Sequence, residues 1–165
     1  MIGETMSDKP LLTCCPANAM RTLYVPHPWI AISITDPPIF GGKPARLSND
    51  SNRLDFLRLS FGDFYEKHFR VVHNGIHLRD EAMTKSDGEK VAEFLRKWHG
   101  KYRVLVCHCE AGVSRSPSML LAIAEWLGVP RSQLEPVGRN WNAQPLNPWV
   151  FKVMKACLKN VKVDQ

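Results

Sequence analysis

Residues 102–128 constrain the fold more than any other stretch, because they read as a buried strand, a tight loop and an apolar helix in immediate succession. The run Val-Leu-Val at 104–106 is apolar without alternation, which is typical of a strand buried on both faces. Pro117 suits the first turn of a helix, where its missing N–H needs no partner. Apolar residues then recur at helical spacing up to Leu127, and Gly128 is placed to end the helix.

The loop between this strand and this helix carries two residues with distinctive chemistry. Cys109 stands at the end of the strand and Arg115 at the start of the helix, so seven residues span both. Such a loop turns successive backbone N–H groups inward beside the positive end of a helix, which makes a cradle for an anion and favours a thiolate. The planar guanidinium of Arg115 can hold two phosphate oxygens at once. The sequence therefore predicts a nucleophile, an anion cradle and a phosphate clamp within one loop.

The order of these residues resembles the signature of the cysteine-dependent protein tyrosine and dual-specificity phosphatases, which is His-Cys, five residues, Arg, then Ser or Thr. The form found here is most similar to the small bacterial and phage-like members of the dual-specificity branch; it reads His108-Cys109-Glu110-Ala111-Gly112-Val113-Ser114-Arg115-Ser116. The resemblance implies a phosphatase that hydrolyses phosphate monoesters through a cysteinyl-phosphate intermediate. Its implied substrates are phosphotyrosine and also phosphoserine or phosphothreonine in proteins. It implies no cofactor.

The resemblance also implies a role for each residue of the signature. Cys109 attacks phosphorus, Ser116 stabilises the thiolate as it leaves in the second step, and His108 organises the loop through hydrogen bonds. The phosphate is held by the guanidinium of Arg115 and by backbone N–H groups of Glu110, Ala111, Gly112, Val113, Ser114 and Arg115.

Two aspartates compete for the role of general acid, which the family places on a separate loop. Asp63 follows the apolar strand that ends in Phe61-Gly62, and it resembles the Phe-x-Asp acid of the small bacterial and phage relatives. Asp80 lies 29 positions before Cys109, a spacing similar to that of the larger dual-specificity enzymes. We favour Asp63, because its strand is longer and is expected to lie beside the signature strand.

The rest of the chain predicts the scaffold. Strands are expected at 11–15, 29–35 and 54–61, an extended loop over the active site at 64–85, and helices at 86–99 and from 148 onward. Ser86 with Glu89 forms a capping-box pattern at the start of the first of these helices. Strands separated by helices predict an α/β fold, here a three-layer-like sandwich with a mostly parallel central sheet of about four to five strands flanked by helices. We expect a loose tail at 1–10 and a single phosphatase-like catalytic domain at 11–162.

Two further residues have competing interpretations. Asn147 suits a plain N-cap before Pro148, which we favour, although a Pro-Asn step near the phosphate site resembles the dual-specificity branch. Cys107 lies on the same strand face as Cys109. We favour a small core residue over a redox partner, because a disulfide between residues so close in sequence is strained.

The composition excludes several other classes of function. The net charge of +6 favours anionic substrates, but no dense Lys/Arg run or recognisable module indicates a specific nucleic acid. The histidines 68, 73 and 77 form no metal-ligand pattern. No apolar run approaches membrane-spanning length, the first nine residues are polar and acidic, unlike a secretory signal, and five cysteines argue against a disulfide framework. We therefore expect a cytoplasmic monomer.

Other functions of the same loop stay open. A phosphate- or phosphoprotein-binding module without turnover needs the cradle but not the nucleophile. A phosphatase for an RNA end or a small molecule needs the same residues as a protein phosphatase. An arsenate reductase or a sulfur-transfer enzyme needs in addition a resolving cysteine or a sulfur donor, for which Cys107 is the near candidate.

Overall fold

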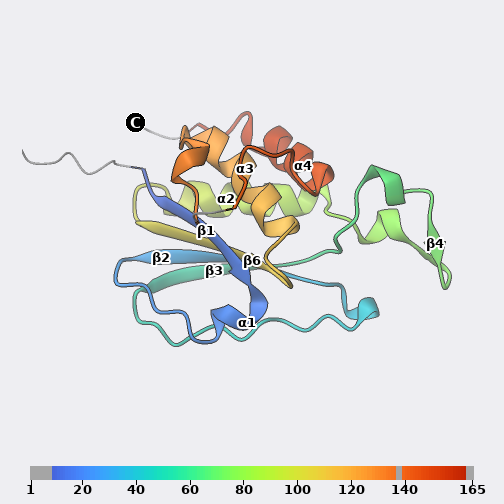
Figure 1. Ribbon diagram of the computed structural model, residues 1–165, viewed down its shortest axis with the longest axis horizontal. Helices are drawn as coiled ribbons and strands as arrows, with labels where there is room; N and C mark the ends of the chain where they lie inside the picture. The colour runs from blue at the N-terminus through green and yellow to red at the C-terminus, as the bar shows by residue number, and fades with distance from the viewer. Residues whose placement is uncertain (1–8, 137–138, 163–165) are drawn as a thin grey trace, which may run out of the picture.

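A four-stranded parallel sheet forms the centre of the protein in the computed structural model, which describes residues 9–136 and 139–162 (Figure 1). The strand order is β1-β6-β2-β3, and all three neighbouring pairs are parallel. These strands are β1 (Leu11–Pro16), β6 (Val104–Cys109), β2 (Trp29–Thr35) and β3 (Arg53–Ser60). The α/β class and the parallel sheet that the sequence predicts are therefore confirmed. The expectation that the strand before Asp63 lies beside the signature strand is wrong, because β2 lies between β3 and β6.

The two faces of this sheet are covered unequally. Helices α2 (Lys85–Trp98), α3 (Arg115–Leu127) and α4 (Pro148–Leu158) lie together on one face, above the sheet in Figure 1. The other face is covered by the short helix α1 (Ala17–Met20) and by the chain between β2 and β3. The third layer of the predicted sandwich is thus thin and mostly irregular.

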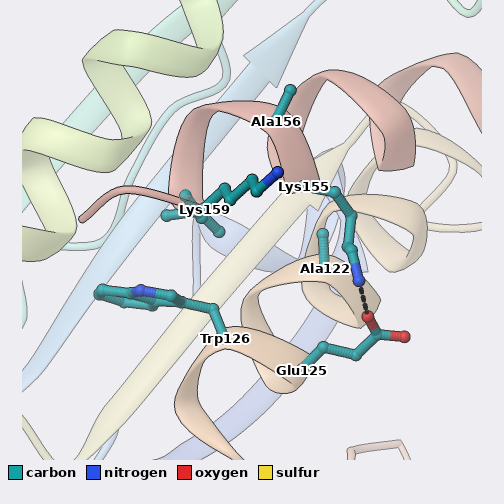
Figure 2. A pocket seen from close by; sticks show the side chains of 7 residues that line it. Ala122, Glu125, Trp126, Lys155, Ala156 and Lys159 are labelled. Atoms are coloured by element: carbon teal, nitrogen blue, oxygen red, sulfur yellow. Dashed lines mark hydrogen bonds and ion pairs between the residues drawn. The ribbon is translucent and has the colours of Figure 1, made fainter. Parts of the chain in front are cut away.

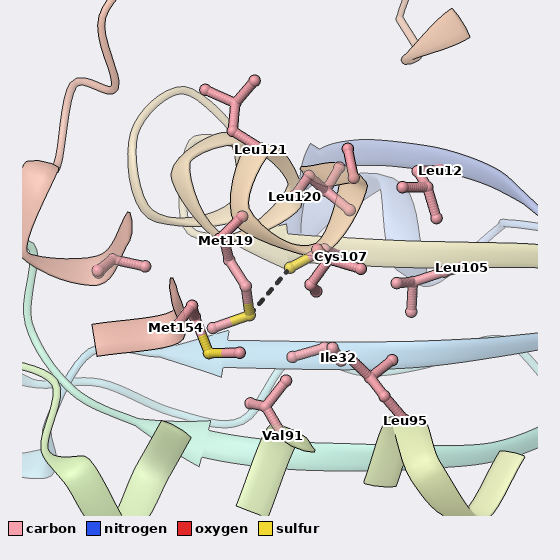
Figure 3. Packing of buried hydrophobic residues seen from close by; sticks show 14 of the residues in the cluster. Leu12, Ile32, Val91, Leu95, Leu105, Cys107, Met119, Leu120, Leu121 and Met154 are labelled. Carbon is pink, nitrogen blue, oxygen red and sulfur yellow. Dashed lines mark hydrogen bonds between the residues drawn. The ribbon is translucent and has the colours of Figure 1, made fainter. Parts of the chain in front are cut away.

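The larger hydrophobic core fills the space between the sheet and the three long helices. Strands and helices both contribute to it, among them Ile32, Leu95, Leu105, Met119 and Met154 (Figure 3). Every residue of β6 is buried, because this strand has a neighbour on each side and packed layers on both faces. The carboxyl end of β6, where Cys109 lies, is therefore held rigidly.

The helix after the signature loop begins and ends as its sequence predicts. α3 starts at Arg115 with Pro117 in its first turn, and Gly128 follows its last residue in the left-handed conformation with φ 70°. All residues from 115 to 124 are buried. Strand, loop and helix thus form one packed unit.

The predicted N-terminus of α2 is wrong by two residues. The N-cap is Thr84, whose Oγ1 accepts from the backbone N–H of Asp87 at 3.1 Å, while Oδ2 of Asp87 accepts from the backbone N–H of Thr84 at 2.8 Å. The capping box therefore joins Thr84 and Asp87 rather than Ser86 and Glu89. Thr84 has the extended backbone that an N-cap requires, whereas Ser86 already lies inside the helix.

The segment predicted as an extended loop over the active site folds mainly into a small hairpin that projects from the body of the protein (Figure 1). It contains the strands β4 (Val72–His73) and β5 (Ile76–His77), which are antiparallel, between the 3₁₀ turns at Glu66–His68 and Leu78–Glu81. Of this segment only Phe64, at its root, lines the pocket around Cys109. The hairpin itself is therefore not a cover for that pocket in the described part of the chain.

Two shorter helical turns and the N-terminal tail complete the description. The 3₁₀ turns lie at Pro38–Phe40 after β2 and at Arg131–Gln133 after α3. Of the tail predicted at 1–10, residues 1–8 lie outside the described residues. Lys9 leads into β1, and its amino group donates to the carbonyl of Gly128 at 2.6 Å.

Candidate active site

A pocket of about 360 Å³ lies at the carboxyl ends of β2, β3 and β6. Ligands of open parallel sheets bind at this edge, because the loops that leave the strands converge there. The pocket is lined by Asp36, Phe40, Gly62, Asp63, Phe64, Cys109, Glu110, Ala111, Val113, Ser114 and Arg115. The predicted nucleophile, most of the predicted phosphate loop and the favoured aspartate therefore come together.

Cys109 is the last residue of β6 and is only 2 % exposed, yet it lines the pocket. Its Sγ lies 3.2 Å from Oγ of Ser116, which is fully buried in the first turn of α3. The hydroxyl of Ser116 can donate to the sulfur and stabilise a negative charge on it. The sequence predicts this pairing, and the structure places the two atoms accordingly.

The turn of the loop requires glycine at position 112. Gly112 has φ 70°, a conformation that other residues rarely adopt, and a Cβ atom there would lie 2.6 Å from the carbonyl carbon of Cys15. The loop therefore closes against the end of β1. Gly112 does not line the pocket itself; it allows its neighbours Ala111 and Val113 to do so.

Arg115 reaches the pocket from the start of α3, and its side chain is 6 % exposed. Its Nη1 donates to Oδ1 of Asp36 at 2.6 Å and to the backbone carbonyl of Phe61 at 2.8 Å. Among the buried side-chain nitrogen and oxygen atoms of the described residues, only Nε of Arg115 lacks a hydrogen-bond partner. A buried cationic N–H without a partner costs free energy, so an acceptor bound in the pocket would stabilise this atom.

Asp63 is held at the pocket by two donors from different elements. Its Oδ1 accepts from the hydroxyl of Ser114 at 2.8 Å and from Nδ2 of Asn147 at 2.8 Å. Within the part of the chain that the structure describes, no hydrogen bond to Oδ2 is present. Asp80, the alternative acid, is exposed in the turn Leu78–Glu81 and does not line this pocket.

Asn147 is the N-cap of α4, as we favoured from the sequence, and it also contacts Asp63. As the N-cap of α4, its Oδ1 accepts from the backbone N–H of Val150 at 3.0 Å. Its Nδ2 faces the other way and donates to Asp63. The side chain is fully buried, so capping of the helix fixes the direction of the amide that holds the aspartate.

His108 is buried on the opposite face of the sheet from Cys109, as alternation along a strand requires. Its Nε2 lies 2.6 Å from Oγ of Ser33, and its Nδ1 lies 3.5 Å from the carbonyl of Cys109. Burial lowers the pKa of His108 to about 4; the contact with the Cys109 carbonyl opposes this, and the cations of Arg58 and Arg115 reinforce it. The imidazole is therefore neutral at pH 7 and ties the end of β6 to β2.

Three other cysteines lie near Cys109 but do not line the pocket. Burial raises the pKa of Cys14 to about 12 and that of Cys15 to about 11, and it raises the pKa of Cys107 well above its ordinary value. These side chains are therefore neutral thiols at pH 7. Sγ of Cys107 packs 3.8 Å from Sδ of Met119 in the core (Figure 3).

Two aromatic residues that the sequence reasoning missed form one wall of the pocket. The rings of Phe40 and Phe64 meet edge to face, with their centroids 5.7 Å apart. Gly62 makes this possible, because a Cβ at that position would lie 2.4 Å from the ring of Phe64. No periodicity in the sequence distinguishes these two loop residues.

Asp36 was also missed, although the sequence carries a signal for it. It follows β2 directly, as Asp63 follows the turn after β3, and both strands end at the same edge of the sheet. The rule that ligands bind at the carboxyl ends of parallel strands therefore indicates Asp36 as well as Asp63.

Comparison with protein-family models, with curated proteins and with solved structures finds no match to this chain. Among the described residues, no helix is long and apolar enough to cross a membrane. Nor does this part of the chain bring three or more His, Cys, Asp or Glu side chains together as metal ligands. The function is therefore argued from the geometry of the site.

Proposed function

We propose that the protein is a cysteine-based phosphatase that hydrolyses phosphate monoesters, with a preference for phosphotyrosine in proteins. The observation that carries the proposal is the buried Nε of Arg115, which has no partner although Arg115 lines the same pocket as the Cys109 thiol. A phosphate bound over the loop supplies the missing acceptor. The phosphatase-like signature and the parallel sheet behind it support the same assignment.

Each catalytic step can be assigned to a described atom. In the first step, Sγ of the Cys109 thiolate attacks phosphorus, the bond to the ester oxygen breaks, and Asp63 gives its proton to that oxygen. In the second step, Asp63 takes a proton from water, the water oxygen attacks phosphorus, and the sulfur–phosphorus bond breaks. The hydroxyl of Ser116, 3.2 Å from Sγ, stabilises the departing thiolate.

The two pocket aspartates have different partners, and this divides their roles. Oδ1 of Asp36 is bound to Nη1 of Arg115, so Asp36 holds the clamp in place. Asp63 has both donors on Oδ1, so Oδ2 is the oxygen that can exchange a proton with substrate and water. The geometry thus supports Asp63, rather than Asp80, as the general acid.

The aromatic wall supports the preference for phosphotyrosine. Phe40 and Phe64 present two rings to the pocket that contains Cys109. Edge-to-face and offset contacts between aromatic rings contribute ~0.5–1.5 kcal/mol beyond burial, and phosphoserine has no ring to gain them. The net charge of +6 also favours an anionic substrate.

We also propose a cytoplasmic location. All five cysteines are free, and a thiolate nucleophile needs a reducing compartment to stay active.

The direct test is turnover of p-nitrophenyl phosphate in the presence of a chelator, for the wild type and for Cys109→Ser. We expect turnover that the chelator does not reduce and that Cys109→Ser abolishes. Binding of a phosphotyrosyl peptide without turnover, between pH ~5 and ~8 where such thiolates and carboxylates are competent, would instead identify a phospho-binding module.

A further inference from the structure

A second pocket, of about 300 Å³, adjoins the candidate active site. Val113 of the phosphate loop lines both pockets. The second pocket lies between α3 and the loop before α4, and we call it the flanking groove. It is lined by Val113, Pro117, Ser118, Leu121, Arg139, Asn140, Trp141, Ala143, Gln144, Pro145 and Leu146.

The lining of the flanking groove is mainly apolar and includes two side-chain amides. Its rim carries two of the most exposed large apolar side chains of the described residues, Val113 at 47 % and Leu146 at 56 %. Asn140 and Gln144 add side-chain amides that can donate to or accept from a peptide backbone. Arg139, the one charged residue of the lining, donates to the carbonyl of Val113 and lies 5.3 Å from the ring centroid of Trp141.

The loop that builds the groove is tied to the rest of the protein at several points. The indole Nε1 of Trp141 donates to the carbonyl of Pro136 at 3.2 Å, and Arg131 donates to the carbonyl of Trp141 at 3.0 Å. At the other end of the loop, the backbone N–H of Asn147 donates to Oγ of Ser118 at 3.1 Å. The groove is therefore preformed, which lowers the entropic cost of binding.

We infer that the flanking groove binds an apolar side chain next to the phosphotyrosine of a protein substrate; the inference rests on the proposed phosphatase function. A phosphate on the loop places its ester chain at the pocket mouth, and Val113 leads directly from there into the groove. An apolar side chain gains burial against Leu121 and Leu146, while the peptide backbone pairs with the amides of Asn140 and Gln144.

The chemistry of the groove favours a peptide over a nucleic-acid end. Recognition of single-stranded nucleic acid uses exposed aromatic faces for stacking and cations for the phosphates. Trp141 is buried, and the guanidinium of Arg139 is engaged with the Val113 carbonyl. The groove thus offers an apolar surface for a peptide side chain and amides for the peptide backbone, but no free stacking surface for a base.

The test compares a small substrate with peptides. p-Nitrophenyl phosphate fills the phosphate pocket alone, whereas phosphotyrosyl peptides with a single leucine, moved along a serine–glycine background, also probe the groove. For the wild type we expect one leucine position to raise kcat/KM about tenfold over the peptide without leucine, the lower end of the ~10–200-fold that a small apolar group contributes in a pocket.

Two exposed residues provide a charge-matched pair of variants. Ala143→Asp places a charge in the flanking groove, and Ala156→Asp places one in a separate pocket of about 460 Å³ between α3 and α4 (Figure 2). We expect Ala143→Asp to remove the leucine preference while turnover of p-nitrophenyl phosphate changes less than twofold. Ala156→Asp should leave both the leucine preference and the turnover of p-nitrophenyl phosphate unchanged, since its pocket shares no lining residue with the groove.

The outcomes separate the inference from the proposed function. Turnover of p-nitrophenyl phosphate with a flat leucine scan overturns the groove assignment and leaves the phosphatase intact. Absence of turnover overturns the proposed phosphatase function. Binding of the same peptides then tests the groove assignment: tighter binding at one leucine position supports it, and equal binding at all positions refutes it. Faster turnover of a phosphorylated RNA end than of every peptide, lost in Ala143→Asp, overturns the peptide assignment.

Discussion

Asp36→Asn tests the arrangement of the site most directly, because it removes the carboxylate that pairs with the buried guanidinium of Arg115. The wild-type contact joins Oδ1 of Asp36 and Nη1 of Arg115 at 2.6 Å. In the variant the amide oxygen can still accept a hydrogen bond, but the charge is lost. The guanidinium then has only neutral acceptors on that side, the new amide oxygen and the carbonyl of Phe61.

The magnitude follows from the burial of the two partners. Hydrogen bonds to charged groups contribute ~1.5–3 kcal/mol. The side chain of Asp36 is 36 % exposed, so solvent screening places this contact at the lower end, about 1.5 kcal/mol. In a chain of this size 1 kcal/mol moves Tm by ~2–4 °C, which predicts a decrease of about 3–6 °C. An equal loss in transition-state stabilisation lowers kcat/KM about tenfold.

Thermal unfolding by circular dichroism and initial rates with p-nitrophenyl phosphate measure the two effects. The matched control is Asp80→Asn, which removes an exposed aspartate outside the pocket and should leave Tm within about 1 °C of wild type. Wild-type values of both Tm and kcat/KM in Asp36→Asn would refute the argument. Faster turnover would show that Asp36 acts mainly by repelling the substrate's phosphate.

Three further substitutions test other parts of the site. Asp63→Asn should lower kcat on phenyl phosphate, which has a poor leaving group, by ~10²–10⁴-fold and remove one limb of the pH–rate profile; normal turnover there, with a loss in Asp80→Asn instead, would transfer the role of acid to Asp80. The pKa of His108 is about 4 in the folded protein and ~6.5 in the unfolded chain, so the unfolded state binds this proton first as pH falls. The free energy of unfolding therefore decreases between pH 6.5 and 4, by about 3 kcal/mol in total. Urea unfolding at pH 7 and 4.5 should show a smaller decrease in His108→Asn than in wild type, and equal decreases would contradict this origin. Gly112→Ala should lose at least tenfold in kcat/KM, since both the φ of 70° and the contact with Cys15 oppose a Cβ. The control is Gly100→Ala, because Gly100 has a similar φ of 75° but no atom within 4 Å of where a Cβ would lie. Equal losses of Tm in these two variants would show that the contact with Cys15 is unimportant.

The parts of the fold that the sequence predicted well are those governed by neighbours in the chain. β6, the signature loop and α3 form one continuous unit, and their boundaries depend on an apolar run, a proline and a glycine. The start of α2 was mispredicted for a related reason. Two overlapping capping patterns, Thr84 with Asp87 and Ser86 with Glu89, fit the local sequence equally well. The choice between them depends on where the preceding chain, which passes Ala82 and Met83 through the core, turns into the helix.

In the candidate site, too, the sequence predicted the residues that are close together in the chain and missed the contacts between distant ones. Cys109 and Arg115 lie six positions apart, and a strand–loop–helix of that length brings their side chains together wherever it occurs. The ion pair of Asp36 with Arg115 joins residues 79 positions apart, and the amide of Asn147 reaches Asp63 across 84 positions. Neither contact has a local signature in the sequence.

By itself, then, the sequence determined the strand–loop–helix unit around residues 109–116 and the parallel α/β class, because both depend on short-range patterns of polarity and backbone preference. The tertiary structure decided the strand order β1-β6-β2-β3, and with it which loops meet at the pocket. Placing β2 beside β6, and β3 beside β2, brings Asp36 and Asp63 to the edge where Cys109 lies. That order results from burial and packing summed over the whole chain, which no single stretch of residues encodes.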